Sequence, residues 1–380
     1  MNLEQFLDGE KKAGVSQGTG SFTISIESAR TKLQKYLLAS REEWIKKLIQ
    51  AVSGWRVNKL EVKQTRTDTV LHFQPSLRFG LPSGADILRT FLEAELEGRH
   101  PLNRFCQALH TLRELESLSF YLAINDGKGG PVVYHDGPHA SATPPKGSPQ
   151  AHFSNAPGIT LGISHKTDGE KESWFPWPFT SPPGKRLMTD LAVALSAASM
   201  TAPVPIVLDS KRLDRLESGP HSKVLAVRGL ELFHRGDKPI VLPRYLFELL
   251  EEEERSGSAQ GDDRIYSGYM LLKFSRARQR SFFCFVDDGA VLERLYLPST
   301  PSISYQVYVN GQGLSTDLGG LSLLGTKPRQ IRIDRAFEEV RRKLAEFCEV
   351  GGLPEGVSGG LEGELRELAS EPMWVTEAGT

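Results

Sequence analysis

The alternation of hydrophobic and polar residues along the chain predicts an ordered series of helices and strands. Ser40 to Glu43 has the spelling of a capping box, and the apolar residues of 41–53 recur at helical spacing. Two alternating runs, 60–65 and 69–73, predict a strand hairpin. The same reasoning predicts helices at 85–97 and 101–115, then strands at 118–124, 131–136 and 158–164. Groups of helices that alternate with groups of strands indicate an α+β layered fold.

The second half of the chain predicts another α+β unit. A helix at 185–200 leads into a strand at 204–209, and an acidic helix is expected at 243–255. Asp288-Gly289 is a strong signal for a two-residue hairpin turn. The other elements expected here are strands at 267–275, 281–287, 290–297 and 303–309, and a helix at 335–347.

Length and composition divide the chain into segments. With 380 residues and about 150 residues per domain, two or three domains are expected. Residues 1–19 and 351–380 are expected to be a flexible lead-in and a flexible tail. Residues 169–184 form a linker rich in proline and aromatic residues, which separates domains at 20–168 and 185–350.

The linker contains a cluster of four aromatic residues with two interpretations. The cluster could bind a partner protein, or it could pack beneath the proline-rich connection. Packing is favoured about two to one, because large exposed apolar patches are rare on soluble proteins. Its members are Trp174, Phe175, Trp177 and Phe179.

Charge and composition exclude several classes of function. The chain has 46 Lys and Arg against 47 Asp and Glu, a net charge of −1, so we expect no nucleic-acid partner. We expect no membrane span, because no stretch approaches about 18 apolar residues, and the start lacks the apolar core of a signal peptide. Three widely separated cysteines fit a reducing compartment, and a cytoplasmic location is expected.

The sequence lacks the common metal-binding motifs. There is no HExxH or paired His/Cys spacing. His135 and His139 are four residues apart, but Gly137-Pro138 prevents the helix that would bring them together. We therefore expect no metal site.

The order of elements resembles a known superfamily. The segment FTISIESARTKLQKYLLASREEWIKKLIQAVSGWRVNKLEV (22–62) resembles the opening of the GHKL ATPases, and more closely that of uncharacterised bacterial relatives of the HtpG-type chaperone. PGITLGISHK (157–166) resembles the closing strand of that domain. The segments 187–213 and 307–324 resemble the beginning and end of the middle, or transducer, domain. The resemblance implies a two-layer α/β sandwich of GHKL type followed by a transducer-like α+β domain.

The residues that bind nucleotide in this superfamily are altered here. The family's E-x-x-x-N on the pocket helix aligns with Lys47 and Ala51; a protonated lysine is no general base, and alanine offers no oxygen to magnesium. Gln50 is the nearby polar group that could approach phosphate. Gln74 stands where the family's aspartate reads adenine, and a single glycine, Gly98, precedes the helix at the phosphate loop.

Three hypotheses follow from the resemblance and its departures. In the first, the chain is a degenerate, chaperone-like module that binds no cofactor, is not an enzyme, and acts on an unknown protein partner; a homodimer is compatible with it. In the second, the chain binds ATP and magnesium, or hydrolyses ATP, through Lys47, Gln50 and Gln74, with Arg78 or Arg104 in altered roles. In the third, the resemblance is accidental and this is another α+β protein.

Overall fold

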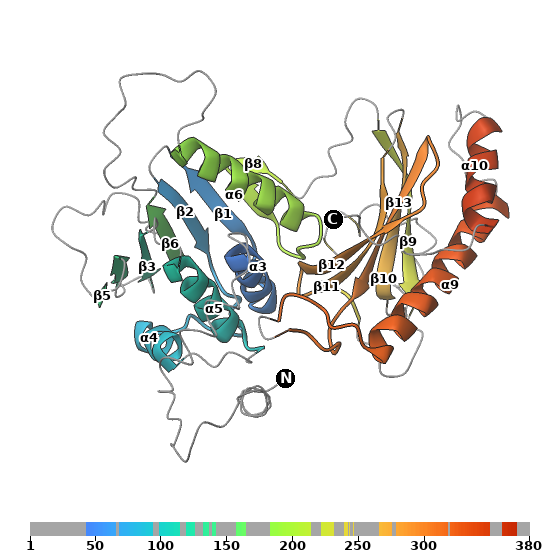
Figure 1. The fold of residues 1–380 in the computed structure, drawn as a ribbon. Coiled ribbons are helices and arrows are strands. Elements are labelled where there is room, and N and C mark those ends of the chain that lie inside the picture. The colour runs from blue at the N-terminus through green and yellow to red at the C-terminus, as the bar shows by residue number, and fades with distance from the viewer. Residues whose placement is uncertain are drawn as a thin grey trace, which may run out of the picture.

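The computed structural model contains two units, each built on its own β-sheet (Figure 1). It describes residues 43–65, 68–93, 99–114, 119–125, 132–136, 139–141, 157–164, 183–213, 222–231, 239–241, 243, 246, 266–275, 279–317, 320–349 and 359–370. The mixed α+β class that the sequence predicts is confirmed.

The first unit contains an eight-stranded sheet in the order β5-β4-β3-β6-β2-β1-β7-β8. β1 pairs with β7 in parallel, whereas the other neighbouring strands pair antiparallel. The strands are β1 (Leu60–Gln64), β2 (Asp68–Phe73), β3 (Ser119–Asn125), β4 (Val132–Asp136), β5 (His139–Ser141), β6 (Gly158–Ser164), β7 (Ile206–Leu208) and β8 (Lys211–Arg212).

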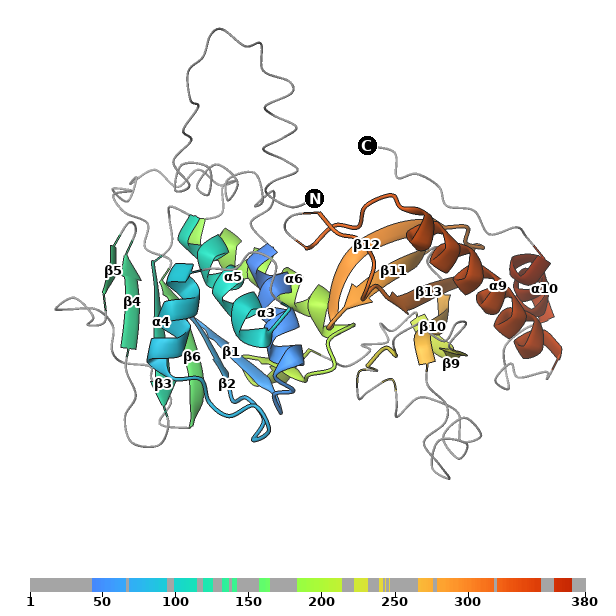
Figure 2. The same cartoon turned by 90° about the horizontal axis from the view of Figure 1, so that it is seen from below.

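Helices cover one face of this sheet (Figure 2). They are α3 (Glu43–Gly54), α4 (Gly84–Glu93), α5 (Pro101–Glu114) and α6 (Pro183–Ser199). Alternate residues of β2, such as Leu71 and Phe73, are buried against the helices because side chains alternate between the two faces of a strand. Trp55, which follows α3, lies 5.8 Å from Phe73 and 5.6 Å from Phe105 of α5, measured between ring centroids. These rings join two helices to the sheet.

The second unit contains a five-stranded sheet in the order β12-β11-β13-β10-β9. β11 and β13 are parallel, and the other pairs are antiparallel. Its elements are β9 (Ser222–Glu231), β10 (Tyr266–Ser275), β11 (Ser281–Asp287), β12 (Ala290–Leu297), β13 (Ile303–Asn310), α9 (Lys327–Glu349) and α10 (Gly359–Ser370).

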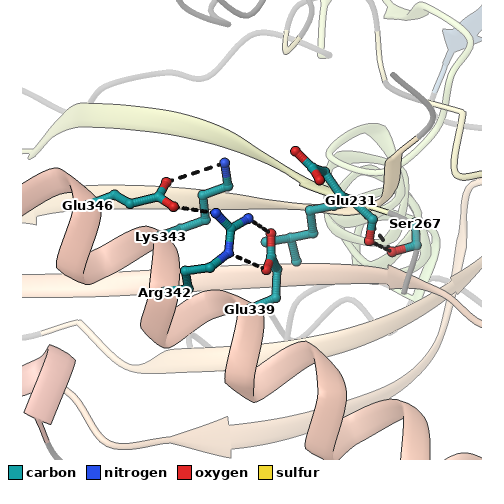
Figure 3. A network of polar contacts seen from close by, with 7 residues as sticks. Glu231, Ser267, Glu339, Arg342, Lys343 and Glu346 are labelled. Atoms are coloured by element: carbon teal, nitrogen blue, oxygen red, sulfur yellow. Dashed lines mark hydrogen bonds and ion pairs between the residues drawn. The ribbon is translucent and has the colours of Figure 1, made fainter. Parts of the chain in front are cut away.

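Helix α9 packs on one face of the second sheet and carries an ion-pair network beside β9 and β10 (Figure 3). Arg342 donates to both Glu339 and Glu346, and Lys343 lies 3.5 Å from Glu346. Arg342 and Glu346 are about half exposed, and a pair between exposed side chains stabilises a fold by only about 0–1 kcal/mol. The helix is therefore held mainly by the apolar core beneath it. In this core the ring centroids of Phe283 and Phe337 lie 5.6 Å apart.

The domain boundary expected at 184–185 is corrected by the sheet topology. β7 and β8 belong to the first sheet, and Leu191, Leu195 and Ile206 belong to the first core. The segment that resembles the start of a middle domain therefore completes the first unit as far as residue 213.

Three further expectations about the second unit are corrected. α9 begins at Lys327, eight residues before the expected start. β9 is a strand that the sequence pattern does not predict. Part of the expected flexible tail is helix α10, whose Leu361, Leu365 and Leu368 are buried in the second core. The predicted acidic helix at 243–255 lies mostly outside the described residues.

Among the described residues, no helix is both long enough and apolar enough to cross a bilayer.

Candidate functional site at the junction of the two units

Helix α3 is buried on its polar side as well as on its apolar side. Leu48, Ile49 and Val52 face the first core, where they are fully buried. Lys47 and Gln50, on the remaining side, are only 9% and 1% exposed. A polar side chain buried to this extent requires hydrogen-bonding partners. Those of Gln50 come from the second unit.

The partner is the hairpin turn between β11 and β12. Gln50 Nε2 donates to the main-chain oxygen and to Oδ2 of Asp287, both at 3.4 Å. Thr201 Oγ1, which follows α6, donates to the Gly289 carbonyl at 2.6 Å. Asp288 and Gly289 have φ values of 47° and 81°, as the Asp-Gly hairpin signal predicts. The two-residue turn is thereby confirmed, and it is held by two segments of the first unit.

Arg104 of α5 supplies the charge that the turn requires. Its Nη2 lies 3.1 Å from Asp287 Oδ2, and its Nη1 pairs with Asp288 Oδ2. The Arg104 side chain is 4% exposed and the Asp287 side chain 6% exposed, so the first pair is buried. A buried ion pair compensates much of its desolvation cost but adds little net stability. This contact therefore determines how the units fit together more than how stable they are.

Burial and charge act in opposite directions on Asp287. Burial raises the pKa of this carboxyl above its ordinary value of 3.8, and the neighbouring Asp288 charge acts in the same direction. Arg104, Arg99 and Lys47 lower the pKa again, but burial is the largest effect. The proton affinity of Asp287 thus depends on the cations that the first unit places around it.

Hydrogen bonding at the junction is incomplete. Gln50 Oε1, Ser53 Oγ and Asp287 Oδ1 are buried polar atoms without a hydrogen-bond partner among the residues that the structure describes. A Cβ atom at Gly289 would lie 2.9 Å from Ser53 Oγ, which places that hydroxyl against the turn. All three atoms therefore belong to residues that line the contact between the units.

The structure brings together two of the four predicted nucleotide-binding residues. Lys47 and Gln50 lie on the buried side of α3, and a Cβ at Gly320 of the second unit would lie 3.2 Å from Lys47 Nζ. Gln74 and Arg78 are exposed on the loop after β2. That loop is joined to the end of α3, because Ser76 N donates to the Trp55 carbonyl at 3.1 Å. A role for the four residues in binding nucleotide stays a prediction.

The predicted partner-binding aromatic residues, Trp174, Phe175, Trp177 and Phe179, lie outside the described residues.

The acidic half of the site does not follow from the sequence analysis. There, Asp288-Gly289 indicates only a turn, and Asp287 is not among the candidate residues. The available signal is an acidic residue at the end of a strand as apolar as SFFCFVD (281–287), where a buried carboxylate requires a cation.

The polar groups at the junction bind one another. Glu43, at its first turn, is the only carboxylate in α3. The Asp287 carboxylate is paired with Arg104. Within the described part of the chain, no group of three or more His, Cys, Asp and Glu side chains could hold a metal ion. The cations and amide of the first unit instead hold carboxylates of the second.

Comparison with known proteins gives a distant likeness to solved structures. No family model matches the chain, and no curated protein matches it. Among solved structures, the MutL ATPase domain of Aquifex aeolicus, complexed with ADP, is similar over 71% of this chain and 92% of its own length. The sequence identity is 9% and the TM-score is 0.35, which is too low to assign a family.

Proposed function

We propose that this chain is a degenerate, chaperone-like module of GHKL type that does not hydrolyse ATP and acts through contact with another protein. One observation carries the proposal: Gln50 and Arg104, which would otherwise be available to phosphate, both bind Asp287 of the second unit. The altered pocket helix supports it, because Lys47 and Ala51 stand where the superfamily has its glutamate and asparagine. A transducer-like role for the second unit and the HtpG-type relationship are parts of the same proposal.

The alternative is an ATP-binding or ATP-hydrolysing GHKL protein with an atypical pocket. The observation that favours it is the cationic character of the junction, where Arg104 holds two carboxylates. Groups that bind adjacent carboxylates can also bind phosphate oxygens. In this alternative, nucleotide would replace the turn, and Gln74 or Arg78 would act in altered roles.

Calorimetric titration of the full chain with ATP and ADP, each with magnesium, separates the two hypotheses. Saturation at about one hundred times Kd would stabilise the folded state by about 2.7 kcal/mol, which raises the melting temperature by about 5–10 °C. We expect neither binding heat nor such a rise. A rise that disappears in Gln50→Ala and Gln74→Ala would establish the alternative instead.

The protein partner is tested separately from the nucleotide. Light scattering of the full chain determines whether a second copy is the partner. If the aromatic segment binds a partner, Trp174→Ala with Trp177→Ala will abolish the association while leaving the melting temperature unchanged. If the double variant associates like the wild type, that surface is not the one used.

A further inference from the structure

The turn Asp287–Gly289 projects from the second unit into a socket on the first. The socket is formed by Gln50 and Ser53 of α3, Arg104 of α5 and the segment around Thr201. We propose that this turn is a releasable latch, so that the two units separate at the junction while each remains folded. The proposal goes beyond the proposed function, because it applies whether or not the chain binds nucleotide.

Each unit has a core that does not depend on the other. The main core of the first unit contains buried residues from Trp44 to Ile206, and that of the second contains buried residues from Leu230 to Leu368. No strand pairs across the two sheets among the described residues. The smaller core on the opposite face of the second sheet receives Met200 from the end of α6, and Met200 is only partly buried. Separation would therefore leave both main cores intact.

The junction itself has the energetics of a contact that can open. Its charged groups lose their hydration when it closes, and this cost offsets much of the attraction between them. In the closed state, Gln50 Oε1, Ser53 Oγ and Asp287 Oδ1 are buried without a hydrogen-bond partner among the described protein atoms. An incompletely satisfied polar network stabilises less than a complete one. Opening would give water free access to all three atoms.

The latch is nevertheless specific in shape and charge. Gly289 fits against Pro203 and Ser53, where a Cβ would lie 2.8 Å and 2.9 Å from their nearest atoms. Arg104 contacts both aspartates at once, so a turn with a single acid would lose one of its two ion pairs. A contact that is specific in geometry but weak in net energy suits a switch between two arrangements.

The test replaces the two carboxylates in the full chain with Asp287→Asn and Asp288→Asn, without nucleotide. Asparagine keeps the shape of the turn and removes its charge. We expect a larger radius of gyration by small-angle X-ray scattering. Amide hydrogen exchange should be at least about tenfold faster at the turn, with unchanged exchange in α3, β1 and β13, because local opening leaves each unit folded.

Glu293→Gln is the matched control. Glu293 pairs with Arg329 at 2.6 Å, and both residues belong to the second unit. Loss of this pair should leave the radius of gyration and the exchange at the turn at wild-type values. If the double variant fails to fold, Asp288→Asn alone removes the half-exposed carboxylate and should accelerate exchange at the turn by a smaller factor.

Two results would overturn the latch. One is a double variant with the wild-type radius of gyration and wild-type exchange at the turn. The other is exchange that accelerates equally at the turn and in both cores, which would mean that the carboxylates stabilise the whole fold instead of closing a junction. Neither result depends on whether ATP binds, so the latch and the proposed function can fail separately.

Discussion

Replacing Gly289 with alanine probes the packing of the junction without changing its charge. Gly289 has a φ of 81°, a conformation that an L side chain adopts only with strain. Its Cβ would lie 2.8 Å from Pro203 Cδ, 2.9 Å from Ser53 Oγ and 3.0 Å from Ala202 Cα. Pro203 and Ala202 belong to the first unit and contribute backbone or ring atoms that move little, so alanine should force the turn out of its socket.

A second glycine separates backbone strain from contact. Gly313 has a similar φ of 88°, but no atom lies within 4 Å of its Cβ position. Both alanine variants incur about 1–2 kcal/mol of left-handed strain. Only Gly289→Ala adds overpacking, which in a closely packed site costs about 1–3 kcal/mol. We therefore expect about 1–2 kcal/mol of destabilisation for Gly313→Ala and about 2–5 kcal/mol for Gly289→Ala.

Urea denaturation measures both values under identical conditions. Both variants lose the same free energy to left-handed backbone strain. The additional destabilisation of Gly289→Ala over Gly313→Ala therefore reports on packing at the junction. If the turn is released instead of compressed, this excess falls toward about 1 kcal/mol and hydrogen exchange at the turn accelerates. Equal destabilisation of the two variants, with unchanged exchange at the turn, would show that Gly289 does not pack against the first unit and would refute the reasoning.

Two further predictions concern the first unit. Phe105→Ala removes a fully buried ring that contacts Trp55 and Phe73. It should lower the free energy of unfolding, measured by urea denaturation, by about 3–5 kcal/mol, and a loss below about 1 kcal/mol would contradict this packing. Burial lowers the pKa of His72, whose Nδ1 lies 2.9 Å from Thr160 Oγ1, so the unfolded chain takes up the proton first. The contribution of neutral His72 to stability is complete above about pH 6.5 and is lost as the pH falls below that value. The wild-type protein should therefore melt at a lower temperature at pH 5.5 than at pH 7.5, and this difference should shrink in His72→Asn. An unchanged difference would exclude this histidine as its cause.

Most elements of the fold could be predicted because their patterns are local. β6, β11 and β12 have the predicted bounds, since continuous or alternating apolar runs end there at turn residues. α10 is not predicted, although Leu361, Leu365 and Leu368 recur at helical spacing, because the glycines around them favour a flexible interpretation. The helical pattern is present in the sequence, and the glycine-rich composition obscures it.

β9 escapes prediction for a physical reason. Its pairing with β10 contains two register shifts, which disturb the alternation of buried and exposed positions. Gly229 within the strand makes room for the Tyr266 ring, and a glycine in that position weakens the strand signal. The start of α9 is also hidden, because the segment from Lys327 to Asp334 is mainly polar.

The site could be predicted only in part because it is formed by residues that are distant in sequence. Arg104 and Asp287 are 183 positions apart, and no local pattern specifies which helix end a hairpin turn will meet. The sequence does contain both halves of the constraint: an arginine in the first turn of an amphipathic helix, and two acids at the end of an apolar strand. The structure buries a charge in each half, and buried charges require partners. An arginine and an acid that are each buried without a partner in their own unit are therefore candidates to pair across units, as Arg104 and Asp287 do at the junction.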